Sequence, residues 1–326
     1  MSMKLLDRIK KGIFIMDGAM GTQIQNFDVP PSAWQDKEGC NELLNLTAPD
    51  IIRQIHTTYF AAGSDAVETN SFGSSPVTLG EYDLSAKARE ISLAAARIAR
   101  EAAAAASTPD RPRYVFGSVG PGTKLPTLGQ IPYDQLRDGL TVQIEGLLEG
   151  GADGILFETC QDLLQIKAGI AAFEKAGGLK AGAPLYVSVT VEQTGTLLIG
   201  SSIAAVVAAL SALPVNILGL NCATGPEAMR IHLDYLAENW TGLLACMPNA
   251  GMPELRSGQV HYPLQALEFA KKLGSMAREV GLNVAGGCCG TTPAHIEALC
   301  NELKGFRAPE RIITAPQQVT SVFGPV

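Results

Sequence analysis

Two adjacent cysteines stand between glycines in the segment Gly286-Gly287-Cys288-Cys289-Gly290. A disulfide between neighbours would strain the peptide that joins them, whereas both sulfurs can face one soft metal ion if the glycines let the backbone turn tightly. Cys222 follows another hydrophobic run, which ends at Asn221. Three thiolates leave one position open on a tetrahedral zinc ion, as is typical of a catalytic site. We predict that Cys222, Cys288 and Cys289 bind zinc and form the catalytic centre.

Other polar residues follow hydrophobic runs in the same way. Asn249, after Met247-Pro248, is a candidate for the fourth zinc ligand, although an asparagine beside proline also suits a simple turn. Glu158 ends an apolar run, and a carboxylate there needs a partner, either a protein cation or the ammonium group of a substrate. Glu68 and Asn70 stand in a similar place. We expect these residues to bind substrate or metal.

The first hydrophobic run leads into Asp17-Gly18-Ala19-Met20-Gly21-Thr22. Its two glycines let backbone N–H groups approach a ligand, and such groups suit an anion such as a carboxylate. The segment lacks the glycine spacing of a Walker or dinucleotide-binding loop, so phosphate binding is not predicted.

Eight apolar runs alternate with helical patterns along the chain. Hydrophobic strands separated by helices indicate a parallel sheet that is covered on its faces, and eight units favour a (β/α)8 TIM barrel over a doubly wound open sheet. Barrel enzymes place their active sites at the carboxyl ends of the strands, where the polar residues above are found. The predicted strands are 13–17, 66–70, 113–118, 154–158, 185–191, 215–221, 242–247 and 283–287. The predicted helices are 48–62, 85–106, 133–149, 163–175, 202–210, 226–238, 264–279 and 293–303.

One barrel domain is expected over residues 1–313, with a short amphipathic helix at 1–11 and an extended, linker-like tail at 314–326. The connection from residue 23 to 40 is long, and we expect it to cover part of the barrel mouth.

The composition argues against two classes of binding partner. The 326 residues are 46% hydrophobic and carry a net charge of −7, without a basic stretch interleaved with aromatics, so neither nucleic acid nor a membrane surface is an expected partner. The N-terminus lacks the unbroken apolar core of a signal peptide. Seven cysteines without such a signal indicate a reducing compartment, and we predict a cytoplasmic location.

Taken together, these motifs resemble the homocysteine S-methyltransferase family over nearly the whole chain. The resemblance rests on residues 17–22, on Glu68-Thr69-Asn70 and Glu158-Thr159, and on the two cysteine segments, all in the order that the family has. Residues 248–251 and 290–296 are most similar to the branch that forms the N-terminal, homocysteine-binding module of cobalamin-dependent methionine synthase. The chain has no Asp-x-His-x-x-Gly cobalamin motif and stops where a folate-binding barrel would begin, so we expect a separated module or a stand-alone relative.

The resemblance implies a zinc-bearing barrel that transfers a methyl group to the thiol of L-homocysteine, giving L-methionine. Cys222, Cys288 and Cys289 would bind zinc, and Asn249 would fill the fourth position until the substrate arrives. Glu158 and Asp17 would lie near the substrate ammonium, and the backbone of residues 18–22 would hold its carboxylate. Methylcobalamin on a separate domain or corrinoid protein would be the donor.

Other interpretations stay open at this point. The chain could act alone with S-methylmethionine or betaine as donor, its zinc could be purely structural, or Cys288 and Cys289 could serve thiol redox chemistry. The strain of a vicinal disulfide argues against the redox reading.

Overall fold

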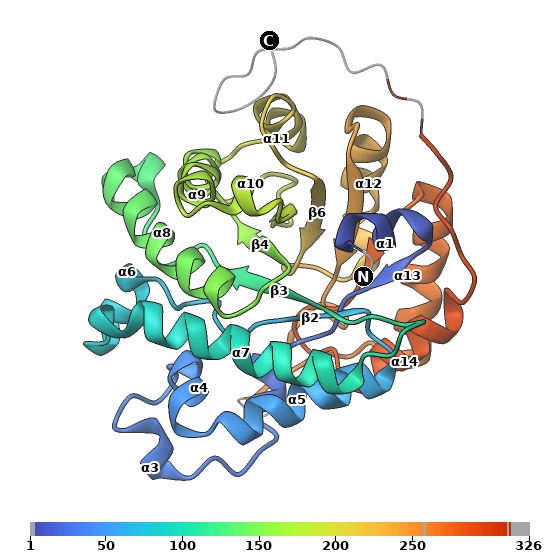
Figure 1. Cartoon of the computed structure of the whole chain (residues 1–326). Coiled ribbons are helices and arrows are strands. Elements are labelled where there is room, and N and C mark those ends of the chain that lie inside the picture. Colours follow the sequence, from blue (N-terminus) through green and yellow to red (C-terminus); the bar gives the residue numbers. More distant parts are fainter. Residues whose placement is uncertain (1–3, 257–258, 312, 314–326) are drawn as a thin grey trace.

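The computed structural model describes residues 4–256, 259–311 and 313, and its main sheet is an eight-stranded parallel barrel surrounded by helices (Figure 1). Starting from β2, each strand pairs with the next one along the chain as far as β7, which pairs with β10, and β10 pairs with β1. The predicted (β/α)8 barrel is confirmed. Its strands are β1 (Phe14–Ile15), β2 (Ala66–Glu68), β3 (Tyr114–Val119), β4 (Gly154–Cys160), β5 (Leu185–Val189), β6 (Ile217–Asn221), β7 (Leu243–Met247) and β10 (Val284–Ala285).

The helices return the chain along the outside of the barrel between successive strands. In α7, for example, Ile91, Ala95, Ala99 and Ala102 are buried, and their spacing of three or four residues gives the helix one apolar face. The long helices are α1 (Leu5–Lys11), α5 (Pro49–Ala62), α7 (Ala88–Ala106), α8 (Tyr133–Glu149), α9 (Leu163–Lys175), α11 (Ile203–Leu210), α12 (Pro226–Asn239), α13 (Ala266–Val280) and α14 (Pro293–Glu302). Short helices are α2 (Gly21–Ile24), α3 (Pro31–Trp34), α4 (Leu44–Thr47), α6 (Pro76–Leu79) and α10 (Gly178–Ala181).

Large side chains fill the inside of the barrel. The rings of Phe116 and Tyr186 meet edge to face, with their centroids 6.1 Å apart, and Phe14 packs against Phe116 in the same manner. Helix α1 adds Leu5 and Ile9 to this cluster. Because α1 covers the end where the strands begin, the open end of the barrel is the one where they finish.

The seam between β1 and β2 is closed by side chains as well as backbone. The Asp65 amide donates to the Ile15 carbonyl at 2.6 Å, and the Ile15 amide donates to Asp65 Oδ2 at 2.9 Å. Arg8 forms a 2.8 Å ion pair with the same Asp65 oxygen. At the other end of the seam, the Glu68 amide donates to both oxygens of Asp17, at 3.2 and 3.1 Å. Side-chain carboxylates thus replace part of the strand ladder.

Two predicted strands were too long. Residues 13–17 and 283–287 contain only the two-residue strands β1 and β10. At 13–17 the side of β1 that faces β2 is bridged by the Asp65 and Asp17 carboxylates instead of a strand ladder. At 283–287 the regular pairing with β1 and β7 ends at Ala285, although the Gly286 and Gly287 amides still donate to the Cys246 and Asp17 carbonyls.

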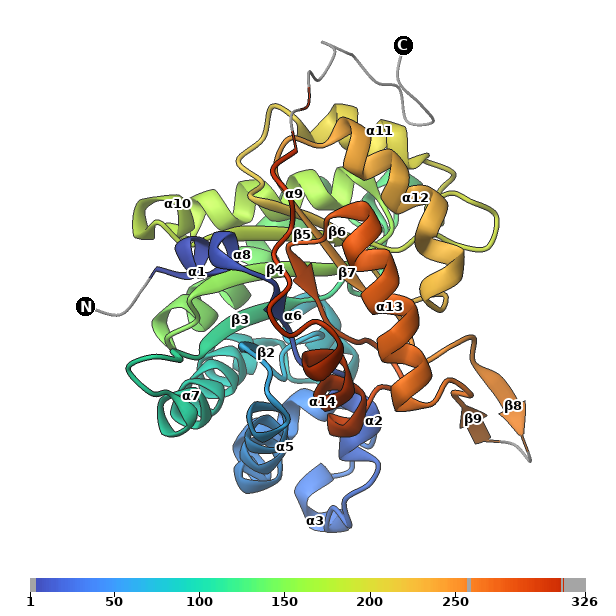
Figure 2. The same ribbon diagram turned by 90° about the vertical axis from the view of Figure 1, so that its right-hand side faces the viewer.

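A small antiparallel hairpin, β8 (Glu254–Arg256) and β9 (Gln259–His261), was not predicted. Figure 2 shows it projecting from the body of the molecule beyond β7. Leu255 and Val260 face each other across it and are 78% and 63% exposed.

The predicted tail at 314–326 lies outside the described residues, and the domain division at 313 stays a prediction. Within the described part of the chain, no helix is both long and apolar enough to cross a membrane.

The seam makes Asp65 a test of barrel closure. We expect Asp65→Ala to lower the free energy of unfolding by about 2–3 kcal/mol, because it leaves the buried Ile15 amide without its acceptor and removes the ion-pair partner of Arg8. Asp234→Ala, which removes a half-exposed partner of Arg230 on α12, should change stability by less than about 1 kcal/mol. Urea unfolding compares the two variants. Equal, small effects would contradict the role of the seam.

Candidate metal centre and substrate pocket

Three sulfur atoms meet at the open end of the barrel. Cys222 directly follows β6, and Cys288 and Cys289 follow β10, so the two strand ends bring together cysteines that are 66 and 67 residues apart in the sequence. The three Sγ atoms all lie within 4.8 Å of one another, with Cys222 and Cys289 at 3.9 Å. Zinc–sulfur bonds of about 2.3 Å at tetrahedral angles separate two sulfurs by roughly 3.8 Å. The spacing therefore fits one zinc ion.

The backbone is strained where it presents Cys222. Cys222 and Ala223 both have left-handed φ angles, of 63° and 52°, and Thr159 at the end of β4 has a φ of 56°. Such angles cost of order 1–3 kcal/mol at residues other than glycine. Asn221 bridges these places: its Oδ1 accepts from the Thr159 amide at 2.9 Å, and its Nδ2 donates to Thr159 Oγ1 and to Cys288 Sγ. Asn221 thus connects strained backbone to one of the three clustered sulfurs.

The segment after β7 lies alongside the cysteine pair. The Cys288 amide donates to the Pro248 carbonyl at 2.9 Å, and the Ala250 amide donates to the Cys289 carbonyl at 3.0 Å. Asn249, between these two contacts, is buried, and its Oδ1 has no hydrogen-bond partner in the described part of the chain. The segment that carries this unpaired oxygen bonds to the backbone of Cys288 and Cys289, so Asn249 Oδ1 is a candidate for one further ligand to a metal ion held by the cysteines.

Tyr262, just after β9, lies near the same centre, where burial and the neighbouring Cys289 raise the pKa of its hydroxyl. Gly290 has a φ of 77°, and a Cβ atom there would lie 2.1 Å from the Tyr262 ring. Glycine at position 290 therefore allows both the turn and the approach of the tyrosine.

The thiols affect one another strongly without a metal. Hydrogen bonds from Cys222 and Cys288 lower the pKa of Cys289 to about 3, and the bonds to Cys222 and Cys289, together with burial, raise the pKa of Cys288. One sulfur of the group ionises at the expense of another, because neighbouring thiolates repel. A dication among them would allow all three to be thiolates.

A pocket of about 360 Å³ extends from the sulfurs into the barrel mouth. No lysine, arginine or histidine is among its lining residues, which include the carboxyl groups of Glu42, Glu68 and Glu158. The pocket is therefore suited to a ligand with a positively charged group. It is lined by residues 18–22, 25, 41, 42, 68–72, 118, 158, 159, 222 and 287–289.

The carboxyl groups at the floor of the mouth are crowded. Burial raises the pKa of Glu158 to about 7, although a hydrogen bond from Ser118 opposes the rise. Burial, together with the charges of Glu158 and Asp17, raises the pKa of Glu68. Burial also raises the pKa of Asp17. Burial is the main cause of all three shifts, and no lysine, arginine or histidine of the described pocket lining offsets it.

The predicted residues of the first loop form one wall of the pocket. Gly18 packs so closely that a Cβ atom would lie 2.5 Å from Thr291 Oγ1, which itself accepts from the Ala19 amide. Gly21 and Thr22 begin the short helix α2, in which the Gln23 and Ile24 amides donate to the Met20 carbonyl, each at 3.0 Å. Thr22 Oγ1 is buried without a partner in the described part of the chain. This wall thus offers an unpaired hydroxyl to a ligand.

Two predicted residues are already engaged by the protein. Asp17 is 1% exposed, is not among the lining residues, and binds the Glu68 amide. Asn70 does line the pocket, but its Nδ2 donates to the Asn41 carbonyl and to Asn45 Oδ1. Of the predicted cover at 23–40, Gln25 is the residue that lines the pocket.

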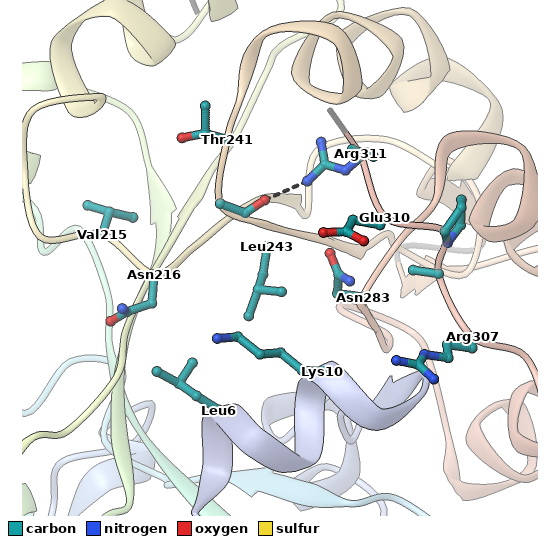
Figure 3. Close-up of a pocket in the computed structure, with 13 residues that line it drawn as sticks. Leu6, Lys10, Val215, Asn216, Thr241, Leu243, Asn283, Arg307, Glu310 and Arg311 are labelled. Atoms are coloured by element: carbon teal, nitrogen blue, oxygen red, sulfur yellow. Dashed lines mark hydrogen bonds between the residues drawn. The ribbon is translucent and has the colours of Figure 1, made fainter. Parts of the chain in front are cut away.

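A larger cavity of about 960 Å³ lies at the other end of the barrel, between α1 and residues 307–311 (Figure 3). Arg311 donates there to the carbonyls of Ala237 and Trp240, each at 3.2 Å. These bonds hold the C-terminal segment against the barrel. Because the cavity has neither the sulfurs nor the buried carboxyl groups, we place the chemistry at the mouth.

Comparison with known proteins shows the family of the chain. The profile of the family described as Homocysteine S-methyltransferase matches residues 14–303. The chain belongs to the homocysteine S-methyltransferase family. It is 46% identical over 98% of its length to the methionine synthases of Mycobacterium tuberculosis and Mycobacterium leprae, of which it spans 27%.

Solved structures of family members have the same barrel. The metallated form of the homocysteine methyltransferase MmuM from Escherichia coli is 26% identical, with a TM-score of 0.70, over 91% of this chain and 98% of that one.

Sequence reasoning had not singled out Asn221 or Tyr262. Asn221 stands next to a predicted ligand, and this adjacency was the available signal. Tyr262 follows a hairpin that gave no clear pattern, so nothing pointed to it.

The pKa of Glu158 predicts how the metal-free protein responds to pH. At pH 5–6.5 the folded state keeps a proton on Glu158 that the unfolded chain, with its pKa near 4.5, releases. The stability that this proton provides is lost as the pH rises toward 7. We expect urea midpoints of the wild type to fall between pH 5 and 7.5 more than those of Glu158→Gln. Glu145→Gln, on the surface of α8, should keep the wild-type slope, and an unchanged slope in Glu158→Gln would contradict the assignment.

Proposed function

We propose that this chain transfers a methyl group to the thiol of L-homocysteine, giving L-methionine, with zinc held by Cys222, Cys288 and Cys289. The observation that carries the proposal is the group of three sulfurs, within 4.8 Å of one another, at the open end of a family barrel. Asn249 is the proposed fourth ligand, because its buried Oδ1 lacks a partner beside the cysteine pair.

The rest of the pocket suits an amino acid. We assign the substrate carboxylate to the wall formed by residues 18–22, where α2 begins and Thr22 Oγ1 is free. The substrate ammonium belongs with Glu158, a buried carboxylate that accepts only from the neutral Ser118 hydroxyl among side chains. Bound in this way, the amino acid would direct its thiol toward the sulfurs.

The charge of the site supports methyl transfer to sulfur. A free thiol with a pKa of about 8.5 is mostly protonated at neutral pH, and bound zinc would keep the substrate sulfur in its nucleophilic thiolate form. Three cysteine thiolates and one zinc ion together carry a net charge of about −1. The site would therefore leave the sulfur of the incoming substrate electron-rich. Neutral histidine ligands would give a more positive site.

We infer that the donor is methylcobalamin on another domain or a corrinoid protein. The identity to methionine synthases, which are far longer than this chain, supports a donor carried by further domains. The surface of the mouth supports it too: of the ten exposed large apolar side chains among the described residues, six lie in loops or first helical turns that follow barrel strands, and two more lie on the β8–β9 hairpin after β7. An apolar rim suits a protein partner better than a small polar donor. The proposal also keeps the predicted cytoplasmic location.

Replacing one sulfur tests the metal assignment. Cys222→Ser should lose bound zinc and homocysteine binding together, because a neutral hydroxyl is a poor zinc ligand. Cys300→Ser, which alters a thiol on α14 outside the pocket, should keep both. Metal analysis and the proton released on homocysteine binding measure the two properties. Full zinc occupancy and binding in Cys222→Ser would contradict the assignment.

Donor specificity can be measured with the zinc-loaded chain. We expect methionine to form from homocysteine with methylcobalamin, and at least about 100-fold more slowly with S-methylmethionine or betaine. Chromatographic detection of methionine gives the rates. Preference for either small donor would establish the stand-alone alternative and contradict the cobalamin assignment.

A further inference from the structure

The side-chain amide of Asn221, the last residue of β6, has one orientation that fits its neighbours. Its Oδ1 accepts from the Thr159 amide at 2.9 Å. A backbone amide can only donate, so the oxygen of the side chain must be the atom that meets it. The NH2 group is then the part that donates to Thr159 Oγ1 at 2.9 Å and to Cys288 Sγ at 3.8 Å. The fold thus presents an N–H donor to Cys288.

This donor is held in place from the backbone as well. Asn221 is 1% exposed, and its carbonyl accepts from Thr190 Oγ1 at 3.1 Å. Among the described residues, its NH2 group donates to Cys288 and to neither of the other two clustered sulfurs. Asn221 is also absent from the pocket lining. It therefore acts on a ligand only through the sulfur of Cys288.

The clustered sulfurs pose a problem of selectivity for methyl transfer. Cys222, Cys288 and Cys289 all line the pocket, so a methyl donor that reaches a substrate sulfur there also comes near them. In the proposed function all four sulfurs are thiolates on one zinc ion, and each is a nucleophile. Methylation of a cysteine would turn a charged ligand into a neutral thioether. The site needs a means of making its own sulfurs react more slowly than the substrate.

We propose that Asn221 protects Cys288 from methylation, because its N–H group bonds to the Cys288 sulfur and makes that thiolate a weaker nucleophile. The inference rests on the proposed function, since it takes the cysteines as zinc-bound thiolates. A hydrogen bond to the charged form of a group stabilises that form. A more stabilised thiolate attacks carbon more slowly. Asn221 is in this sense a positioning residue that sets which sulfur receives the methyl group.

The experiment treats the zinc-loaded chain with methyl iodide in the absence of homocysteine. A cysteine sulfur then forms a bond to the methyl carbon, the carbon–iodine bond breaks, and iodide leaves. Peptide fragmentation in a mass spectrometer gives the initial rate at each cysteine, with Cys222 as the internal reference. We expect Asn221→Ala to raise the rate at Cys288 relative to Cys222 by about 3–10-fold. Asn221→Asp, which keeps an acceptor for the Thr159 amide but has no N–H group, should do the same, and it serves if Asn221→Ala folds poorly.

Two control variants separate this effect from a loosened fold. Asn283→Ala removes another asparagine that bridges strands, whose Oδ1 accepts from the Leu244 amide at 2.9 Å at the opposite end of the barrel. Thr159→Val removes the hydroxyl that Asn221 bonds to, but leaves the N–H group that faces Cys288. Both variants should keep the wild-type ratio of methylation rates.

Zinc content, measured before each reaction, distinguishes the ways in which the inference can fail. An equal rise at all three cysteines in the Asn221 variants, or an unchanged ratio, would overturn the protective role while zinc binding by the wild type keeps the proposed function. Loss of zinc from both Asn221 variants would also overturn it, because Asn221 would then support the metal site rather than weaken one nucleophile. A wild type that binds no zinc would overturn the inference and the proposed function together.

Discussion

Electrostatic repulsion at the barrel mouth is the constraint on which the site depends. Three thiols lie within 4.8 Å of one another, and buried carboxyl groups line the adjoining pocket without a lysine, arginine or histidine among them. Like charges in a poorly solvated pocket repel strongly, so these groups either keep protons or are compensated by cations from outside the chain. In the function proposed above, a zinc ion and the substrate ammonium would be two such cations.

The fold holds the three thiols and the carboxyl groups close together even though their charged forms repel one another. Left-handed backbone at Cys222 and Ala223, and the bridge through Asn221, fix one sulfur against another. Thr22 Oγ1, Glu68 Oε1 and Asn249 Oδ1 are buried without a hydrogen-bond partner in the described part of the chain, and such atoms lower the stability of the folded state. The aromatic interior and the carboxylate seam on the closed side supply stability that is independent of the ligand.

Much of this could be predicted from the sequence, because residues that end or directly follow the strands of a parallel barrel gather at one mouth. The three cysteines, Glu158 and the glycine loop at 18–22 are all such residues. The hairpin β8–β9, Tyr262 and the short β1 and β10 could not be predicted, since they depend on contacts between distant segments rather than on local periodicity. The same is true of Asp17, whose type and position suggested a ligand contact, while its hydrogen bonds to the Glu68 amide appear only in three dimensions.

Zinc K-edge X-ray absorption on the zinc-loaded chain tests the central claim most directly. Before substrate is added, the coordination sphere should contain three sulfurs and one oxygen or nitrogen. With L-homocysteine it should contain four sulfurs, and with L-homoserine, which has a hydroxyl in place of the thiol, it should keep three. A sphere with fewer than three sulfurs, or one that homocysteine leaves unchanged, would contradict the account.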